Sequence, residues 1–499
     1  MLSNAASLRP FAFELVLALG IFVVLGVGLL AKTASRRLSL GLTTVTLLGA
    51  VLAMHATAEP EARGLFGGLV ARDAYGDFFK LLAAVAGAIV ALASIASEEV
   101  LDQRDGDRDA AEYGALLLAV VLGAGLMAAA SDLLTVTLSV ELVSILSYAL
   151  AAFSRRTSRS AEAGLKYVIY GGVATGTMLY GFSLLYGLAG STDLVAVRTV
   201  VATAPVIVSA TALALCLAGF GFKLAIVPFH AWCPDVYEGA PTPISAFFSI
   251  VPKAAGFALV YRFLIGADAP TDAGGAPAPW AVALGALAVA SMTLGNLAAL
   301  AQRNLKRLLA YSSIAHAGTM LLAFAAGTEA ASRALLLYLG IYLFMNLAAF
   351  LAAMALFRQG VGETVDDFAG LGRRAPVPAL CLTLALISLT GLPPLGGFVA
   401  KYAIISAVIA RGVDGGGATF FLLALAAVLN TVVSLAYYAR VVKAMYFGHP
   451  AKHHGGPLHL APLHTALLVV TTVPVVLLGV YLQPLSSLVA RSTQLWSGR

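Results

Sequence analysis

Long apolar segments constrain the fold of this 499-residue chain more than any other feature. About 20 apolar residues in a helix are enough to cross the hydrocarbon core of a bilayer. Runs of that length lie near residues 11–31, 38–55, 75–97, 113–130, 132–153, 162–188, 205–231, 241–265, 280–301, 305–327, 329–357, 376–411, 415–446 and 462–486. The runs are continuous rather than alternating, which excludes a transmembrane β-barrel. The sequence therefore predicts an all-α polytopic membrane protein with about 14 transmembrane helices.

The positive charges predict how these helices are oriented. Lys and Arg gather in every second loop except the one between segments seven and eight, which has no positive charge. Loops rich in these residues lie on the cytoplasmic side. The other loops hold mostly isolated arginines such as Arg198, Arg333 and Arg411. This distribution predicts a multi-pass protein with both termini on the outer side of the membrane. The first apolar run is longer than the core of a signal peptide, so we expect it to be retained as a helix.

Composition argues against several classes of function. The formal net charge is +6, but the positive residues are scattered rather than gathered in one stripe, which argues against nucleic acid as a partner. The three cysteines, Cys216, Cys233 and Cys381, lie far apart and form no CxxC pair. They therefore predict neither a metal or iron–sulfur site nor a disulfide framework. There is no nucleotide-binding fingerprint, and we expect no cofactor in this chain.

One apolar stretch carries unusual chemistry, GFGFKLAIVPFHAWCPDVYEGAPTPISAFFSIVPKAAG at residues 219–256. Lys223 and Lys253 fall at membrane depth, where a charge is costly and faces a wet cavity or a partner. Proline has no N–H to donate, and its ring collides with the carbonyl four residues earlier. The sequence therefore predicts helix breaks at Pro228 and at Pro252. Broken helices of this kind mark ion sites in transporters.

Further ionisable residues fall inside other apolar segments. Glu141 lies halfway along the fifth segment, and Lys223 is the cation we expect to hold it ionised; the alternative is a neutral, hydrogen-bonded glutamic acid. His316 lies in the middle of the tenth segment, where an imidazole can relay protons or simply be hydrogen-bonded inside the bundle. His230, just after the first break, is a candidate relay beyond Lys223. For Lys253 the alternative is a snorkelling side chain, which would have to span half the bilayer.

Other charged residues are open to simpler interpretations. Lys166 starts the sixth segment, and an interfacial anchor explains it almost as well as a functional role. Asp235 and Glu238 follow the first break, where we expect solvated loop residues. No role is predicted for Glu14 in the first segment. The histidines His449, His453, His454 and His459 are interpreted as a solvated loop rather than a built metal site.

The two halves of the chain repeat one pattern. Segments four to eight and nine to thirteen each hold five crossings, and each fourth crossing is interrupted by proline and carries a lysine, Lys223 or Lys401. An odd number of crossings per repeat makes the two repeats inverted in the membrane. The predicted organisation is an N-terminal three-helix segment at 1–112, a first repeat at 113–265, a second repeat at 280–446, and a C-terminal loop and helix at 447–499.

The motif GFKLAIVPFHAWCPDVYEGAPTPISA resembles the seventh and eighth transmembrane helices of the antiporter-like proton-pumping subunits of respiratory complex I and of multisubunit cation/proton antiporters. The resemblance implies that Glu141 and Lys223 are the family's glutamate–lysine pair. It also implies that Lys253 links two half-channels, and that Lys166 matches a lysine of the family.

The break predicted in the second repeat lies in LTGLPPLGGFVAKYAIISA, and Lys401 follows its double proline. At this site the resemblance implies glutamate in one complex I pumping subunit and lysine in two others, and this chain is similar to the shorter of those two. The family implies a membrane-arm subunit of NADH:quinone oxidoreductase that moves protons, with NADH, FMN, iron–sulfur clusters and quinone in other subunits. Implied partners are a neighbouring antiporter-like subunit, small membrane subunits, lipid and protons. The alternatives are a multisubunit sodium/proton antiporter, a ferredoxin-dependent photosynthetic or hydrogenase-type relative, and a purely structural scaffold.

Overall fold

The computed structural model describes residues 6–30, 36–59, 61–95, 106–154, 157–264, 279–449, 458, 460–493 and 495. Within these residues, 14 helices are long and apolar enough to cross a membrane. Each of them corresponds to one of the predicted segments, so the predicted all-α polytopic fold is confirmed. The chain divides into two compact units, which are described separately below.

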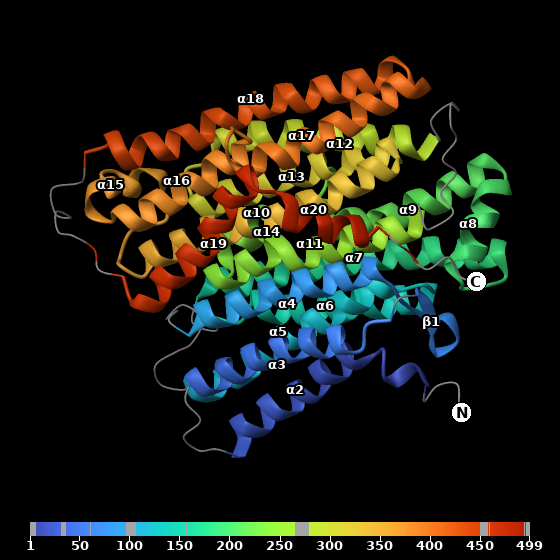
Figure 1. Cartoon of the computed structure of the whole chain (residues 1–499), viewed down its shortest axis with the longest axis horizontal. Helices are drawn as coiled ribbons and strands as arrows, with labels where there is room; N and C mark the ends of the chain where they lie inside the picture. Colours follow the sequence, from blue (N-terminus) through green and yellow to red (C-terminus); the bar gives the residue numbers. More distant parts are fainter. Residues whose placement is uncertain are drawn as a thin grey trace. The chain divides into compact units, whose positions relative to one another are not determined.

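Unit 1 comprises Met1–Ala225, Ile250–Pro270 and Ala490–Arg499. Its elements are α2 (Ala12–Leu30), α3 (Arg36–Ala56), β1 (Arg63–Leu65), η1 (Phe66–Gly68), β2 (Val70–Arg72), α4 (Ala74–Ser94), α5 (Gly106–Ala129), α6 (Leu133–Ala151), α7 (Ser158–Ala189), α8 (Leu194–Thr203), α9 (Val206–Leu224) and the second part of α11 (Thr242–Leu264). Helices α2 and α3 pack against α4 and α5 (Figure 1). The strands β1 and β2 form an antiparallel hairpin in which Leu65 is opposite Val70. The apolar segments did not predict this hairpin.

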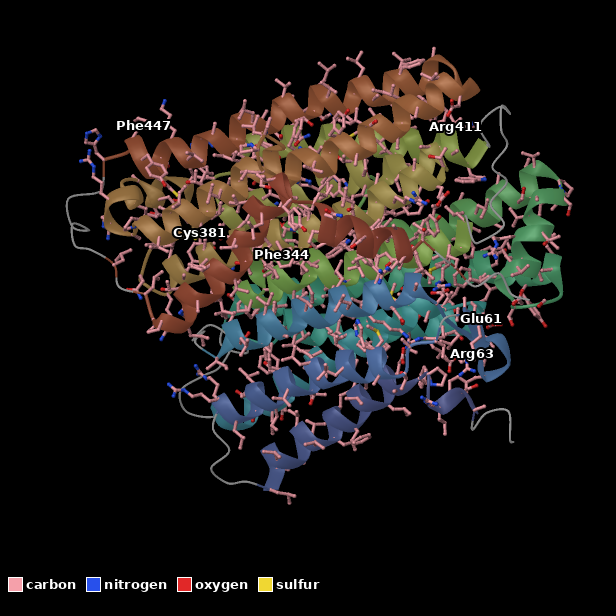
Figure 2. All side chains as sticks on the ribbon, in the orientation of Figure 1. Glu61, Arg63, Phe344, Cys381, Arg411 and Phe447 are labelled. Carbon is pink, nitrogen blue, oxygen red and sulfur yellow. The ribbon has the colours of Figure 1, made fainter. Side chains whose placement is uncertain are left out.

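Unit 2 comprises Ile226–Ser249 and Thr271–Val489. Its elements are α10 (Trp232–Gly239), the first part of α11, α12 (Pro279–Ala301), α13 (Leu305–Ala326), α14 (Glu329–Phe357), η2 (Val365–Phe368), α15 (Leu371–Arg374), α16 (Pro376–Thr390), α17 (Gly396–Arg411), η3 (Gly412–Gly416), α18 (Ala418–Phe447), α19 (Pro462–Val480) and most of α20 (Gln483–Arg491). Helices α13 and α14 are buried over almost their whole length. In Figure 2, Arg411 marks the turn from α17 into α18, and Phe447 marks the far end of α18.

Two of the three predicted helix breaks are present. Helix α9 ends at Leu224, and the next residue, Ala225, has a left-handed backbone with φ 55°. Helix α16 ends at Thr390, and Gly391 follows with φ 89°. Each break contains a cis X-Pro bond, at Pro228 and at Pro394. The breaks place helix ends, with their unsatisfied backbone groups, inside apolar sequence.

The break predicted at Pro252 is wrong. Helix α11 runs without interruption from Thr242 to Leu264 with Pro252 inside it. A proline inside a helix costs about 3 kcal/mol. The whole span of α11 is buried, so packing on every side of the helix outweighs the loss of one backbone hydrogen bond.

Short backbone bridges recur at equivalent places in the two predicted repeats. Asp132, the N-cap of α6, pairs with Asp193 in an isolated antiparallel bridge. Asn304, the N-cap of α13, pairs with Thr364 in the same way. Both bridges tie the start of the second helix of a repeat to the chain that follows its third helix. This match agrees with the internal repeat that the broken helices indicate.

Candidate functional site

Lys223 lies in the last turn of α9 and is buried, with 2% of its surface exposed. Its Nζ donates a hydrogen bond to Ser144 Oγ on α6 at 2.7 Å, and Ser144 Oγ donates to Val140 O. Glu141 is half-buried one turn before Ser144 and is coupled electrostatically to Lys223. The predicted glutamate–lysine partners are therefore on neighbouring helices, and a serine hydroxyl is the direct partner of the ammonium.

Lys253 lies on α11 with 1% of its surface exposed. Gly256 is one turn further along the same face of the helix. A Cβ at Gly256 would lie 3.4 Å from Lys223 Cβ, so α11 and α9 make close contact beside Lys223. Small residues at helix contacts inside membranes permit this approach. The structure therefore brings the helices of Lys223 and Lys253 together within unit 1.

Lys166 lies on α7 and is partly exposed. Its Nζ forms an ion pair with Glu162 Oε1 at 2.8 Å on the same helix, and the Lys166 side chain is 38% exposed. The next residue, Tyr167, is buried and packs edge-on against Tyr148 of α6 with ring centroids 4.8 Å apart. This placement favours the interfacial anchor for Lys166.

Lys401 lies on α17, just after the second break, with 8% of its surface exposed. Its Nζ donates to Thr390 O at 2.9 Å. That carbonyl ends α16, where helix carbonyls lack intrahelical partners and the helix dipole attracts a cation. Gly391 makes room for the contact, since a Cβ there would lie 2.7 Å from Lys401 Cδ. The acceptor that the proline break leaves free is therefore taken by the lysine itself.

His316, with 3% of its surface exposed, is the centre of a hydroxyl cluster inside unit 2. His316 Nδ1 lies 2.6 Å from Tyr338 Oη of α14, and Nε2 lies 3.5 Å from Tyr438 Oη of α18. The Tyr438 hydroxyl also bonds the hydroxyl of Ser312. Hydroxyl and imidazole groups both donate and accept hydrogen bonds. A chain of such groups can pass a proton from one member to the next.

His230 lies in the first break, between α9 and α10, and is half-buried. Its Nδ1 is buried and has no hydrogen-bond partner within the described ranges. Of the predicted histidine loop, His453, His454 and His459 lie outside the described residues. Among the described residues, no three or more His, Cys, Asp or Glu side chains form a group that could hold a metal ion.

The expectation that Asp235 and Glu238 are solvated loop residues is wrong. Both lie on α10, and both bind Arg307 Nη1 of α13, at 2.5 Å and 3.0 Å respectively. The break allows α10 to turn and pack against α13, which brings these charges together. Sequence reasoning also missed Ser144 and the tyrosines around His316. A signal was present in Tyr338 and Tyr342, which are four residues apart and share one face of α14.

Two broken helices, each with a buried lysine beside the break, define an ion-translocating membrane protein. A sequence model of the family described as "NADH:quinone oxidoreductase/Mrp antiporter, TM" matches residues 130–430, and the chain belongs to this family. The predicted family resemblance is thereby confirmed.

Two relatives match along the whole chain. The "NADH-quinone oxidoreductase subunit N" of Anaeromyxobacter sp. strain Fw109-5 is 41% identical, over 99% of this chain and 98% of the relative. The "NADH-quinone oxidoreductase subunit N 2" of Sorangium cellulosum is 43% identical, over 99% of both. A chain of respiratory complex I from Thermus thermophilus is structurally similar, with a TM-score of 0.75 and 31% identity over 95% of this chain and 98% of that chain.

Proposed function

We propose that this chain is a membrane-arm subunit of a NADH:quinone oxidoreductase, the counterpart of its relatives named subunit N, and that it translocates protons. One observation carries the proposal. Lysines are buried beside both helix breaks in a chain that is 41% and 43% identical to such subunits along 99% of its length. A buried lysine can release its proton, unlike an arginine. Quinone reduction elsewhere in the complex drives the movement.

In the first repeat, Glu141 and Lys223 form the loading site. Ser144 Oγ holds the Lys223 ammonium in place, and Glu141 adds a carboxylate one turn before Ser144 on α6. When the balance of nearby charges changes, Lys223 gives up its proton, because Coulomb interactions are strong in a low-dielectric interior. Lys253 accepts it on the neighbouring helix. His230 is the relay candidate in the break, and Lys166 has an anchoring or accessory role.

In the second repeat, His316 and Lys401 carry the proton onward. The hydroxyls of Tyr338 and Tyr438 lie on both sides of the imidazole, so a proton arriving at one ring nitrogen can leave from the other. Lys401 loads or releases the proton at the second break. Its ammonium is held by Thr390 O, a neutral acceptor, so deprotonation leaves no unpaired anion at this contact.

The proposal includes the organisation of the chain, its place in the membrane and its partner subunits. Residues 113–265 and 280–446 are the two repeats, joined to a three-helix segment at 1–112 and a C-terminal segment at 447–499. The chain lies in the bacterial inner membrane with both termini on the outer side. It contacts a neighbouring antiporter-like subunit and small membrane subunits, and the redox cofactors of the complex belong to other chains.

A sodium/proton antiporter subunit is the second candidate, because the description of the matching family includes antiporters. Dependence on sodium separates the two. Proton pumping that is driven by NADH oxidation and unaffected by sodium supports the first candidate. Sodium-dependent proton exchange without NADH supports the second.

Replacement of Glu141 by Gln in the assembled complex tests the proposal. Gln keeps the shape of the side chain but removes the anion that favours protonated Lys223. We expect proton pumping by vesicle-reconstituted complex to fall sharply when the Glu141→Gln variant assembles normally. The matched control is Glu329→Gln, which removes an exposed carboxylate on α14. Normal pumping by an assembled Glu141→Gln complex would refute the role of this pair.

A further inference from the structure

A second group of buried charges lies in the N-terminal helices of unit 1, apart from the residues used above. Lys80 Nζ of α4 lies 2.6 Å from Glu14 Oε1 of α2, and the two side chains are only 2% and 1% exposed. One turn before Lys80 on α4, Asp77 pairs with Arg72 of β2 at 3.0 Å. A lysine and a glutamate buried inside a transmembrane bundle are costly unless they have a function or a close partner.

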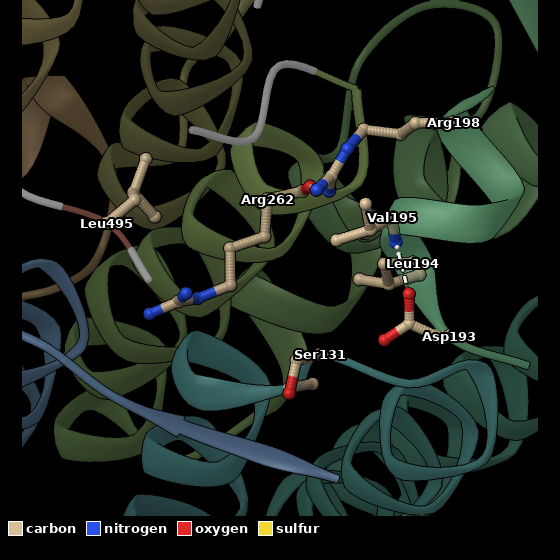
Figure 3. A pocket seen from close by; sticks show the side chains of 8 residues that line it. Ser131, Asp193, Leu194, Val195, Arg198, Arg262 and Leu495 are labelled. Carbon is tan, nitrogen blue, oxygen red and sulfur yellow. Dashed lines mark hydrogen bonds between the residues drawn. The ribbon is translucent and has the colours of Figure 1, made fainter. Parts of the chain in front are cut away.

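Two neighbouring ion pairs in this unit are built differently. Arg72 and Arg262 both donate to backbone carbonyls as well as to a carboxylate, and Arg262 binds Asp73 Oδ1 at 2.5 Å. Figure 3 shows Arg262 lining a small pocket together with Ser131, Asp193 and Arg198. An arginine remains protonated at any usable pH, so the arginines of these two pairs keep their positive charge. The pair at Glu14 uses a lysine, which can exchange its proton.

The carboxylate of Glu14 lacks the additional hydrogen bonds that would stabilise a permanent negative charge. Among the described residues, neither Oε1 nor Oε2 accepts a hydrogen bond beyond the contact with Lys80. Stable buried ion pairs usually gain further hydrogen bonds to the remaining lone pairs. The proton can therefore move within the pair, with one N–H bond of Lys80 breaking and one O–H bond forming on Glu14. Both products are neutral, and the charge of the pair does not change.

Asp77 lies in the first turn of α4, between this ion pair and the N-terminal end of the helix. Its side chain is 25% exposed, and its Oδ1 has no hydrogen-bond partner in the part of the chain that the structure describes. It interacts electrostatically with both Lys80 and Glu14. Asp77 and Lys80 are three residues apart and lie on the same side of the helix. In the proposed topology this end of α4 is on the outer side, so Asp77 can take up a proton there.

We propose that Asp77, Lys80 and Glu14 form a second proton-binding site, which loads a proton from the outer side into the N-terminal helices. This inference goes beyond the proposed function, because none of the three belongs to the chain of lysines in the repeats. Gly125 of α5 packs against the Lys80 stem, since a Cβ there would lie 3.4 Å from Lys80 Cγ. A bound proton therefore adds one positive charge directly beside the helix that opens the first repeat.

Several other titratable groups lie on the elements packed around this site. They are Arg36, Arg37 and His55 on α3, Asp109, Glu112 and Tyr113 on α5, Arg63 and Arg72 on the hairpin, and Asp73, Tyr75 and Arg262 near the start of α4 and the end of α11. Of these, His55 carries an imidazole and is exposed, with Nδ1 bonded to Val51 O. A His55→Ala variant therefore belongs among the controls.

Infrared difference spectra of the assembled complex between acidic and alkaline samples test the site. We expect a carboxylic acid band that is lost in Glu14→Gln and retained in His55→Ala and in Glu329→Gln, which removes an exposed carboxylate on α14. Lys80→Arg should also lose the band, because an arginine keeps its proton and holds Glu14 ionised. Asp77→Asn should slow the appearance of the band after a pH jump.

The double variant Glu14→Leu with Lys80→Met keeps the experiment interpretable, because replacing a whole buried ion pair by apolar residues often preserves folding. A spectrum without a band that depends on Glu14, in a complex that assembles normally, would overturn the proposal and leave a structural ion pair. The outcome is independent of the proposed function. Pumping that survives Glu141→Gln would remove the proposed translocation path and leave the Glu14 band unaffected.

Discussion

Replacing Gly391 by Ala tests whether the geometry of the second break positions Lys401. Gly391 has φ 89°, and its Cβ would lie 2.7 Å from Lys401 Cδ, whereas ordinary contacts begin at 3.4 Å. The lysine stem must therefore move by about 0.7 Å (3.4 Å minus 2.7 Å). A movement of that size is enough to stretch the 2.9 Å contact with Thr390 O beyond hydrogen-bond distance.

Two energies add in this variant. Left-handed backbone costs a residue with a side chain about 1–2 kcal/mol. A hydrogen bond to a charged group is worth about 1.5–3 kcal/mol. The matched control is Gly190→Ala, because Gly190 has φ 61° and open space around its Cβ, so it bears the backbone cost alone. The difference between the two variants is the lost hydrogen bond, which corresponds to roughly a ten- to hundredfold change in how often Lys401 is correctly placed.

The assay is proton pumping by vesicle-reconstituted complex, expressed per quinone reduced, with assembly checked on native gels. We expect Gly391→Ala to pump at about one tenth of the wild-type rate or less, and Gly190→Ala to stay close to wild type. Neither variant changes a titratable group, so the loss would come from position alone. Equal pumping by the two variants would show that the contact between Lys401 and Thr390 does not matter for translocation.

Three further predictions concern the same path and its orientation. Ser144→Ala should lower pumping, because it leaves the buried Lys223 ammonium without its hydroxyl acceptor at a cost of about 1–3 kcal/mol. Ser144→Thr keeps the hydroxyl and should pump at the wild-type rate. Equal pumping rates for the two variants would count against the contact. Lys401→Arg should impair pumping at least as much as Lys401→Ala, since arginine cannot release its proton; an arginine variant with wild-type pumping would remove the proton-carrier role. A reporter that is active only in the cytoplasm should be silent when fused to Arg499, and a strong signal would mean that the outer side is wrongly assigned.

Sequence alone predicted the transmembrane helices and two of the breaks, because both depend on local properties. Apolar length determines whether a segment can span the bilayer. At Pro228 and Pro393 the proline prevents regular helix hydrogen bonding, and the helix ends before it. At Pro252 the same effect was outweighed by burial on all sides of α11, which depends on neighbours that a local pattern does not contain.

The partners of the charged residues were harder to predict than the charges. Glu141 and Ser144 are one turn apart on α6, and a small rotation of that helix decides which one meets Lys223. The ion pairs of Asp235 with Arg307 and of Glu14 with Lys80 join residues 72 and 66 positions apart in the chain (307 minus 235 and 80 minus 14). Such pairs follow from how whole helices pack. The sequence predicted a cation partner for Glu141, but it predicted a solvated loop for Asp235 and no role for Glu14.

The two breaks also show how far the internal repeat extends. Measured from the left-handed residues Ala225 and Gly391, the cis prolines follow three positions later in both repeats. Lys223 lies two residues before Ala225. The equivalent residue in the second repeat, two residues before Gly391, is Leu389, which is buried and apolar. Lys401 instead lies after its break and reaches back to the end of α16. The repeats therefore share the backbone of the break and differ in which side of it supplies the lysine. In the first repeat the cation is attached to the helix that ends at the break, whereas in the second it is attached to the helix that begins there. A sequence pattern that counts one lysine for each broken helix cannot separate these arrangements, because only the structure shows that Lys223 bonds to a neighbouring helix and that Lys401 bonds across its own break.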